Sequence, residues 1–550
     1  MKQQVFSNSC FAEEEKQQLL LLIDKHCMRL REHITAEHNR KLLNLWIKQR
    51  PTSPECVINR SDRTLSVEEH NVLYRGLNHH ILPKKVTGYD IKAAIEKVYY
   101  GITKVEQQPQ NSGEKLSTSN LKNELKGLTR NFLNAAKHIC ASRTNQSFHK
   151  TLYALAKDPD IAITKYDKGN GVCILKRAEY LEKLDVITSD SSKFNKVEKS
   201  TRKNARHPIY RKQENVNDVI KEHLGFLTKQ QLKAVRATGC EVGKLYGCCK
   251  VHKENFPIRP IVSMINTPEY GLAKYLDSTI KPHIPNKYSV TSNKEFLERL
   301  KKLDHQEDDF CVSFDVVSLF TNVPLEETIQ IVADQLYDEN PGEKPRIKRH
   351  GLISLLKTAT GGYFSHRNDI YQQHDGVAMG NPLAPTLANY FLGHLEKQLF
   401  EGNPVNKDYP IFYIRYVDDV FCVFRKTSDY KIFLDKLNSL HANLQFTYEF
   451  GGNNMPFLDT RVRLSPEGVD STVFRKSTNT DVVLNYDAVA PISWKRGLVK
   501  CLLHRAKVVC SNNDNLQQEV AKLREIFSKN GYPTKFFDRI QQQMIGKKDE

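Results

Sequence analysis

Apolar residues in the first part of the chain recur at the spacing of an amphipathic helix. This pattern runs from Glu13 to Arg50, with basic residues between the apolar positions, until Pro51 and Pro54 end it. We expect this stretch to be a helical lid or an arm that faces nucleic acid. Further helices are predicted after the capping sequence Ser66–Glu69, over Tyr89–Tyr100 and over Leu121–Leu155.

Strand-like patterns begin at Ile161. The stretch Ile161–Leu175 predicts two strands around the glycine-rich turn Asp167–Gly171. The backbone amides and the lysine of such a turn can hold a phosphate, although by itself the turn is an ordinary hairpin. Ser189–Asn217 is polar and strongly basic, so we expect a solvated insertion or one that touches nucleic acid.

The rest of the chain mixes helical and strand-like segments, which predicts an α+β fold. A short helix is expected after Thr228. Strands are expected within Phe256–Ser263, from Phe310, and from Ile411 to about Leu484. Helices are expected over Tyr270–Ile280, over Leu325–Leu336, from the loop Gly376–Pro385 to Leu399, and in three stretches after Trp494.

The stretch Ile411–Phe424 contains two apolar runs that flank Asp418 and Asp419. Each run predicts a buried strand, so the two acids fall at the tip of a β-hairpin. Adjacent carboxylates repel each other unless a cation lies between them, which indicates a metal site. Taken alone, however, a pair of aspartates in a turn more often serves only to solvate it.

Charge points to a polyanionic partner. Lys and Arg number 82 against 64 acids, giving a net charge of +18. Nucleic acid is a better candidate than membrane, because no basic amphipathic helix stands out. The alternative is a soluble protein that is merely basic.

Cysteine usage and apolar runs indicate an intracellular protein. The twelve cysteines form no CxxC pair, and Cys240, Cys248, Cys249 and His252 fit no zinc template, so we expect buried thiols in a reducing compartment. No apolar run approaches the roughly 18 residues of a membrane span. The N-terminus lacks the apolar core of a signal peptide.

Asp315 supplies the chemistry that the hairpin lacks by itself. Nucleotidyl transfer uses two Mg²⁺ ions about 3.5–4 Å apart, held by carboxylates on rigid strands. Asp315 ends an apolar strand, and the segment up to Asp418 has room for a helix, a loop and a second helix. A strand, then helices, then a carboxylate hairpin is the palm layout of template-directed polymerases.

Three further features agree with a polymerase. Phe320 comes five residues after Asp315. The polymerase palm places the side chain at this spacing beneath the 2′ position of the nucleotide sugar, where an aromatic ring blocks a 2′-hydroxyl and favours deoxynucleotides. Small residues in Gly376–Pro385 allow a base pair and the template to approach the backbone closely. Upstream cations can grip the incoming triphosphate, and these are Lys250, Lys253 and Arg259.

With these motifs in place, the chain resembles the reverse transcriptase of Penelope-like retroelements. The stretches with the strongest resemblance are Ser313–Pro324, Gly376–Pro385 and Arg415–Phe421. The resemblance covers nearly the whole chain. It extends over Leu65–Leu77, Lys165–Asn170, Leu245–Lys253, Arg259–Ser263, Phe446–Glu449, Pro456–Asp459, Thr472–Asp481, Lys495–Val499 and Leu503–Ala506.

The resemblance implies a right-hand polymerase with an α+β fold. It places a helical N-terminal region over residues 1–155 and fingers over 156–300. The palm, an antiparallel sheet with helices, covers 301–484, and the reverse transcriptase domain covers about 240–484. A helical thumb that resembles a helix-turn-helix segment covers 485–550.

The resemblance also implies roles for individual residues. Asp315, Asp418 and Asp419 correspond to the catalytic, metal-binding acids, with Asp419 the least direct ligand, and the backbone carbonyl of Val316 is a further metal ligand. Substrate-binding positions are Lys250, Lys253, Arg259, Phe320, Met379 and Gly380. Nucleic-acid-binding positions are Gly376, Pro382, Tyr416, Arg475 and Lys476, the last two in the strand Phe474–Lys476 that resembles the primer grip.

A few positions depart from the usual patterns. Met379 stands where the wider class has Gln, although this family commonly has Met; Asn381 replaces Ser, and Cys248-Cys249 replaces Leu-Pro. Many family members also carry a C-terminal GIY-YIG endonuclease preceded by zinc-binding residues, which is missing before Glu550. We therefore expect the endonuclease-lacking branch or a truncated copy, and by analogy with telomerase an enzyme that extends exposed chromosome ends.

The expected function is RNA-directed DNA synthesis. The expected partners are an RNA template, a DNA primer or chromosomal DNA end, dNTPs and two Mg²⁺ ions, with Mn²⁺ as an alternative, and the expected location is the nucleus after synthesis in the cytoplasm. The oligomeric state stays open. One alternative is an RNA-templated RNA polymerase, against which Phe320 argues. The other is a decayed or domesticated element that only binds nucleic acid, against which the three intact aspartates argue.

Overall fold

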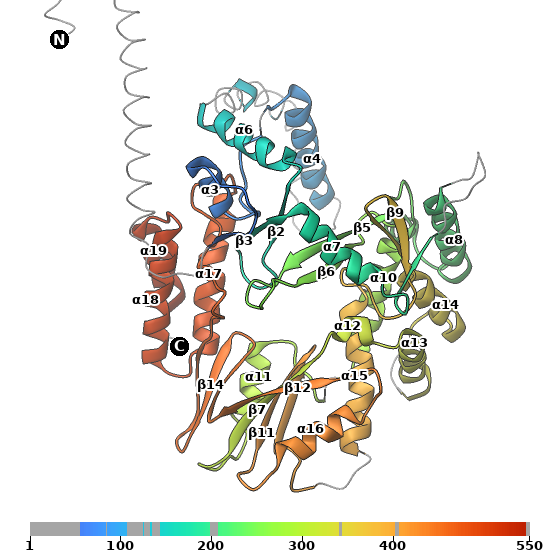
Figure 1. The fold of residues 1–550 in the computed structure, drawn as a ribbon, viewed down its shortest axis with the longest axis vertical. Helices are drawn as coiled ribbons and strands as arrows, with labels where there is room; N and C mark the ends of the chain where they lie inside the picture. The colour runs from blue at the N-terminus through green and yellow to red at the C-terminus, as the bar shows by residue number, and fades with distance from the viewer. Residues whose placement is uncertain are drawn as a thin grey trace, which may run out of the picture. The chain divides into compact units, whose positions relative to one another are not determined.

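A computed structural model describes residues 56–83, 85–106, 125, 132–134, 143–197, 207–285, 287–339, 344–401 and 406–545. The helix expected over Glu13–Arg50 and much of the one expected over Leu121–Leu155 lie outside these residues. The chain divides into two units, residues 1–55 and 56–550, and every element below belongs to the second unit (Figure 1).

A four-stranded antiparallel sheet carries the predicted hairpin. Its strand order is β10-β11-β7-β12. The strands are β10 (Phe412–Tyr416), β11 (Asp419–Phe424), β7 (Phe310–Val316) and β12 (Phe446–Gly452). Aromatic and β-branched residues dominate the two central strands, β7 and β11, which suits a pleated surface that is buried on both faces. The expected hairpin between β10 and β11 is confirmed.

The two faces of this sheet pack against different partners. Val312, Phe314 and Cys422 point into a helical core, whereas Phe421 and Val423 point into a second core with α11 and the β13–β14 hairpin. This split follows the alternation of side chains along a strand. The helices of the first core include α10 (Tyr270–Ile280), α13 (Leu325–Asp334), α14 (Arg349–Thr360), α15 (Ala384–Glu401) and α16 (Tyr430–Asn438).

Short elements join these parts. They are α11 (Asn293–Leu300), η1 (Lys281–His283), α12 (Leu319–Asn322) and η2 (Gln335–Glu339). α12 directly follows β7 and begins at Ser318, whose φ of +51° turns the chain away from the sheet. The strand that the sequence predicts from Phe310 therefore ends just after Asp315, at Val316.

A second, five-stranded sheet has the order β4-β9-β8-β5-β6. Its strands are β4 (Phe194–Lys196), β9 (Asp369–Gln373), β8 (Tyr363–His366), β5 (Gly243–Cys249) and β6 (Ile258–Ser263). The prediction of an insertion over Ser189–Asn217 is wrong at both ends, because Phe194–Lys196 pairs with β9 and Pro208 begins a helix. Local composition did not reveal this pairing, since the partner strand lies far away in the sequence.

A three-stranded sheet with the order β1-β3-β2 adjoins the second sheet through a bridge between Tyr166 and Cys249. Its strands are β1 (Val57–Asn59), β3 (Val172–Lys176) and β2 (Ile161–Lys165). The hairpin of β2 and β3 is confirmed. The helices α3 (Val67–Tyr74), α6 (Arg143–Lys157) and α7 (Arg177–Thr188) pack against this sheet, and α4 (Gly88–Glu106) precedes α6 in the chain. The helices α8 (Pro208–His223) and α9 (Lys229–Val235) belong instead to the first helical core.

The predicted capping sequence Ser66–Glu69 is confirmed, and the structure adds a second one. The Ser66 side chain accepts from the backbone N–H of Glu69, whose carboxylate accepts from the N–H of Ser66 at 2.9 Å. Thr228 and Gln231 form the same reciprocal cap at the start of α9. Each cap satisfies two backbone donors that a helix start leaves without partners.

The C-terminal part contains one more sheet and three helices. The sheet is β13 (Asn454–Phe457), β14 (Thr460–Ser465) and β15 (Gly468–Val473), and the helices are α17 (Ile492–Val509), α18 (Asn513–Lys529) and α19 (Thr534–Ile545). The three predicted helices are confirmed, and they enclose a core of their own. Strand structure ends at Val473, so the prediction of strands up to Leu484 is wrong for the last segment, Phe474–Lys476 included.

The described helices and sheets confirm the α+β class. Within the described ranges, no helix combines the length and the apolar character that crossing a membrane requires.

Candidate active site

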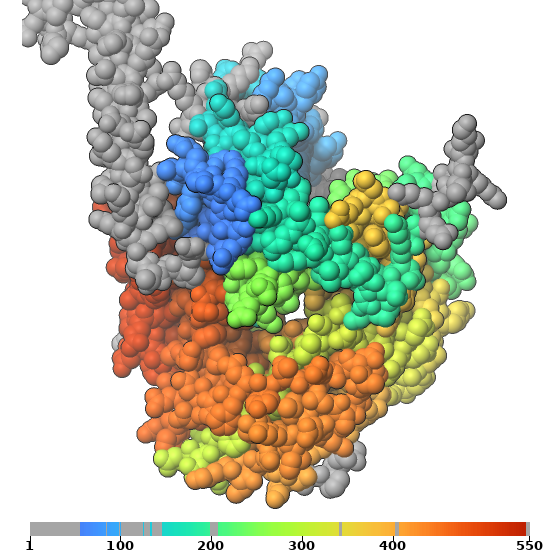
Figure 2. Space-filling model, viewed as in Figure 1, coloured from blue at the N-terminus to red at the C-terminus, as the bar shows by residue number. Residues whose placement is uncertain are grey.

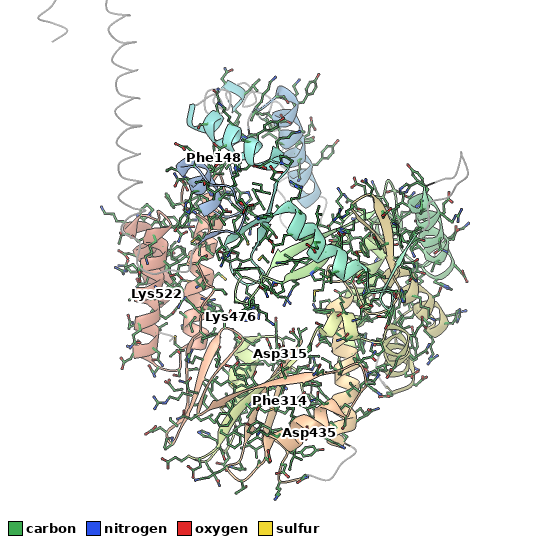
Figure 3. All side chains as sticks on the ribbon, viewed as in Figure 1. Phe148, Phe314, Asp315, Asp435, Lys476 and Lys522 are labelled. Atoms are coloured by element: carbon green, nitrogen blue, oxygen red, sulfur yellow. The ribbon has the colours of Figure 1, made fainter. Side chains whose placement is uncertain are left out.

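Asp315 and Asp419 lie directly opposite each other on neighbouring strands. β7 and β11 are antiparallel, and their register pairs Asp315 with Asp419. Asp418 occupies the turn before β11, and its backbone oxygen accepts a hydrogen bond from the Val316 N–H at 3.2 Å. The fold thus brings all three predicted acids to one end of the sheet, where Asp315 faces the hollow between this sheet and the β5–β6 hairpin (Figures 2 and 3).

Burial and mutual repulsion shift the ionisation of these acids. Burial raises the pKa of Asp419 to about 6, and Asp418 and Asp315 add to the shift. Burial also raises the pKa of Asp315, followed by the charge of Asp418. Three negative groups this close together form a site that a cation would stabilise.

The donor atoms fit Mg²⁺. Among the residues that the structure describes, no three His, Cys, Asp or Glu side chains form a group able to hold a metal ion. Mg²⁺ nevertheless keeps several waters and takes only one or two carboxylates, so the Asp315–Asp419 pair offers a suitable set of hard oxygens. Val316 lies next to this pair and faces Phe446 of β12 in the sheet register.

Arg415 supports the hairpin from below. Its side chain is 1% exposed and bonds to Glu396 of α15, with Nε–Oε1 at 2.6 Å and Nη2–Oε2 at 3.0 Å. Its Nη1 donates to Asn389 at 2.7 Å and to the backbone oxygen of Val417 at 3.1 Å. Val417 has a φ of +56°, a strained conformation for a β-branched residue, so this hydrogen bond holds the turn that presents Asp418.

Sequence reasoning did not single out Arg415 and Glu396 as a pair. The available signal was a charged residue, Arg415, inside an otherwise apolar strand. Charges in such positions are rarely buried unless they are paired.

The loop with Gly376 and Gly380 connects the sheet end to the second sheet. The Val377 N–H donates to the oxygen of Phe320 at 2.7 Å, and the Val262 N–H donates to the oxygen of Met379 at 2.9 Å. Gly380 has a φ of +121°, and a Cβ there would overlap the oxygen of Val262. Both predicted glycines therefore lie where the backbone of another element approaches closely. Phe320 and Met379 take part in the two hydrogen bonds that join this loop to α12 and to β6.

Asn381 and Pro382 follow this loop. The Asn381 side chain donates to the backbone oxygen of Ala359 at 2.9 Å and accepts from the Leu383 N–H at 3.0 Å. Asn381 is buried, so the amide that stands in place of the usual Ser ties the loop to α14. Pro382 is half-buried between these anchors.

The three predicted triphosphate-binding cations belong to the β5–β6 hairpin. Arg259 Nε lies 3.0 Å from Oδ1 of Asp167. Burial lowers the pKa of Lys250, and the charge of Arg259 adds to the effect. The positive charges of Lys253 and Arg259 lower the pKa of Asp315 and so partly offset the effect of burial. Both cations are therefore within electrostatic reach of this acid.

Of the side chains predicted to bind nucleic acid, Tyr416 and Lys476 lie near the catalytic acids, whereas Arg475 does not. Tyr416, 37% exposed, ends β10 opposite Asp419, and Lys476 lines a cavity of about 480 Å³ together with Asp315 and Asp419 (Figure 3). Arg475 instead turns toward α18, where its two Nη atoms bond to the carboxylate of Glu519. Arg475 thus fixes the segment after β15 to α18, while Lys476 faces the acids.

Family comparison agrees with this geometry. Residues 251–449 match the family described as reverse transcriptase (RNA-dependent DNA polymerase), and residues 482–542 match the animal helix-turn-helix domain. The first match contains Asp315 and the hairpin, and the second spans α17, α18 and most of α19. The expected enzyme class, an RNA-directed DNA polymerase, and the expected helix-turn-helix segment are confirmed.

No curated protein matches the chain. Similar solved structures include telomerase from Candida albicans in complex with a TWJ fragment of telomeric RNA, at a TM-score of 0.45 and 11% identity over 88% of this chain and 75% of that one. Apo telomerase from Candida tropicalis has a TM-score of 0.43 and 12% identity over 82% and 76% of the two chains. At TM-scores below 0.5, nothing about function follows from this similarity.

Proposed function

We propose that this protein is the reverse transcriptase of a Penelope-like retroelement, which extends a DNA primer on an RNA template with dNTPs. The observation that carries the proposal is the direct register of Asp315 with Asp419, with Asp418 in the adjoining turn. The matched reverse transcriptase domain supplies the enzyme class. The motifs Ser313–Pro324, Gly376–Pro385 and Arg415–Phe421 support the narrower family.

Two Mg²⁺ ions, or Mn²⁺ in their place, complete the proposed site. Asp315 and Asp418 would hold them, with Asp419 as a less direct ligand and the Val316 carbonyl as a further one. When bound, such ions activate the primer hydroxyl and stabilise the charge of the triphosphate.

The surrounding side chains bind and orient the substrates in this proposal. Arg259, Lys250 and Lys253 bind the triphosphate through charge-assisted hydrogen bonds. Phe320 lies beneath the sugar and excludes a 2′-hydroxyl. Its backbone bond to Val377 and the link from Met379 to Val262 keep the loop and the ring in a fixed relation.

The remaining contacts concern template and primer. Tyr416, Lys476 and the small residues Gly376, Gly380 and Pro382 border the space that the nucleic acid would occupy. The net charge of +18 supports a long phosphate contact surface. With a chromosomal DNA end as its primer, the enzyme would act in the nucleus.

Primer extension tests the proposal. Purified protein is given an RNA template, a DNA primer, Mg²⁺ and either dNTPs or rNTPs. We expect extension with dNTPs, and we expect Asp418→Asn to lower its rate by about three orders of magnitude, because several kcal/mol of transition-state stabilisation is lost. Primer–template affinity should change by less than about twofold, because the fold and the basic surface stay the same.

Asp435→Asn is the matched control, since Asp435 is exposed on α16 and lies away from Asp315 (Figure 3). This variant should extend primers at the wild-type rate. If wild-type protein extends primers no better than Asp418→Asn, the proposed polymerase activity is wrong, and a remnant that only binds nucleic acid is favoured. Extension with rNTPs instead of dNTPs would favour the RNA polymerase.

A further inference from the structure

The turn between β2 and β3 lies beside the catalytic carboxylates, although it precedes the matched reverse transcriptase domain in sequence. Lys168 of this turn lines the cavity of about 480 Å³ that also contains Asp315 and Asp419. Lys168 also lines a second cavity of about 280 Å³, which reaches Arg505 of α17. One side chain thus borders both the reaction centre and the space toward the C-terminal helices.

The turn is held in this place from two directions. The Asp167 N–H donates to the oxygen of Cys249 in β5 at 2.9 Å. The Asn170 side chain donates to the oxygen of Val482 at 2.9 Å. The turn therefore bridges the β5–β6 hairpin and the segment before α17.

Glycine is required for this close fit. Gly169 has a φ of +112°, and a Cβ there would lie 2.7 Å from the backbone oxygen of Thr478. At Gly171 a Cβ would overlap the ring of Tyr166, which is buried. The backbone of the turn packs directly against the segment that follows Lys476, which leaves the Lys168 side chain as the group that reaches outward.

Asp167 and Lys168 face different groups. The side chain of Asp167 is 4% exposed and pairs with Arg259, on the side of the triphosphate-binding cations. Lys168 is exposed and opposes the raised pKa values of Asp315 and Asp419. Among the described residues, no carboxylate lies within ion-pair distance of its ammonium, so it is available to an anion.

The position of Lys168 favours a primer phosphate over the triphosphate as the anion that it binds. Both cavities that Lys168 borders also contain Phe474, Lys476 and Thr478, whereas neither contains Lys253 or Arg259. A primer whose 3′ end reaches Asp315 and Asp419 would carry its last phosphodiesters along this wall.

We propose that Lys168 binds a backbone phosphate close to the 3′ end of the primer and so holds the primer beside the carboxylates. This assignment rests on the proposed polymerase function. It makes the β2–β3 turn a part of the active site that lies outside residues 251–449.

Neutral phosphate analogues test the contact directly. Primers carry a single methylphosphonate at one of the last four linkages, and their affinity for the protein is measured in complex with the RNA template without dNTPs. We expect one of these linkages to weaken wild-type binding about tenfold and to leave Lys168→Ala unaffected. The salt dependence of Lys168→Ala binding should fall by about one phosphate contact.

Steady-state kinetics separate this role from a structural one. Lys168→Ala should raise the KM for primer–template about tenfold, while kcat and the KM for dNTP stay within about twofold, and Lys168→Arg should restore most of the loss. Lys176→Ala is the matched control, because Lys176 lies at the other end of the same hairpin and pairs with Asp62 on the surface. It should behave as wild type.

Two kinds of result are distinguishable. If wild-type protein extends primers and every methylphosphonate acts equally on wild type and Lys168→Ala, or if only the KM for dNTP rises, the assignment of Lys168 is wrong and the polymerase stands. If wild-type protein binds the primer–template but extends nothing, the proposed function itself is overturned.

Discussion

Arg415 and Glu396 form a buried, two-point ion pair directly beneath the hairpin that carries Asp418 and Asp419. The same guanidinium donates to the oxygen of Val417, the residue with a φ of +56° at the turn. Since two hydrogen bonds to Glu396 and one to Asn389 fix the guanidinium on α15, its bond to the Val417 oxygen fixes the position of the turn relative to that helix. The position of Asp418 thus depends on a charge pair that never meets substrate.

Arg415→Ala should destabilise the protein and reduce extension. Removing one partner of a buried pair leaves an unpaired charge, which costs about 3–5 kcal/mol. Chemical denaturation would report this loss as a lower midpoint, and extension assays below the transition would report a lower kcat from the displaced turn. The comparison variant is Lys287→Ala, because Lys287 forms an exposed pair with Glu401 at the end of the same helix. Its effect on stability should be small, because exposed ion pairs are screened by water and contribute little.

Gly380→Ala should impair the enzyme more than an ordinary surface change. The positive φ and the approach of Val262 leave no room for a methyl group, so either the loop or β6 has to move. We expect a loss of about 1–3 kcal/mol in stability and a higher KM for dNTP. Gly497→Ala provides the contrast, since a Cβ at Gly497 in α17 meets no atom within 4 Å. There, alanine should add about 0.5–1 kcal/mol of stability, and a loss at Gly497 as large as that at Gly380 would contradict this reasoning.

Arg475 and Lys476 should give opposite phenotypes despite being neighbours. Arg475→Ala leaves Glu519 buried without its cation, so we expect a lower midpoint of thermal unfolding and little change in the salt dependence of binding. Lys476→Ala removes a cation from the cavity beside Asp419, so we expect weaker primer–template binding with unchanged stability. The reverse result for the two variants would show that the nucleic acid lies on the α18 side.

Glu269→Gln should change how stability depends on pH. Glu269 is fully buried beside Lys212, with Oε1 3.8 Å from Nζ, and burial raises the pKa of Glu269. A carboxyl whose pKa is raised in the folded state favours folding only while it is protonated. Its contribution to the free energy of unfolding therefore falls as pH rises from the pKa of the unfolded state, about 4.3, through the higher pKa of the folded state.

Removing the titration should therefore make Glu269→Gln gain stability relative to wild type as pH rises above about 4.3. Denaturation midpoints at several pH values from 4 to 7.5 would measure this difference. Glu467→Gln serves as the control, because Glu467 is exposed in the turn between β14 and β15. A constant difference between Glu269→Gln and wild type across this range would contradict the prediction.

Local patterns in the sequence were sufficient to identify the hairpin and its partner strand. Ile411–Phe424 and Phe310–Val316 are rich in aromatic and β-branched residues, so their extended structure does not depend on distant information. The grouping of Asp315 with Asp418 and Asp419 followed from the chemistry, since a two-metal site needs several carboxylates, whereas the direct register of Asp315 with Asp419 came from the structure. The three C-terminal helices were equally clear from their periodicity.

Contacts between distant segments were not accessible in the same way. Phe474–Lys476 resembles the primer-grip strand of the family, yet Arg475 forms an ion pair with Glu519 of α18, and the chain leaves the sheet after Val473. The turn with Lys168 looked like an ordinary hairpin because its neighbours, Cys249 and Val482, lie far along the chain. Tertiary partners decide both cases, and no local pattern encodes them.

The docking of the β2–β3 turn limits how this polymerase can be divided into modules. Asp167 holds Arg259, Asn170 holds Val482, and Tyr166 bridges to Cys249, so three distant parts of the chain share one small junction. A shortened protein that begins at residue 240 would keep every catalytic aspartate but lose this junction. Deletions upstream of residues 251–449 would therefore inactivate the polymerase even where all of its sequence motifs are kept.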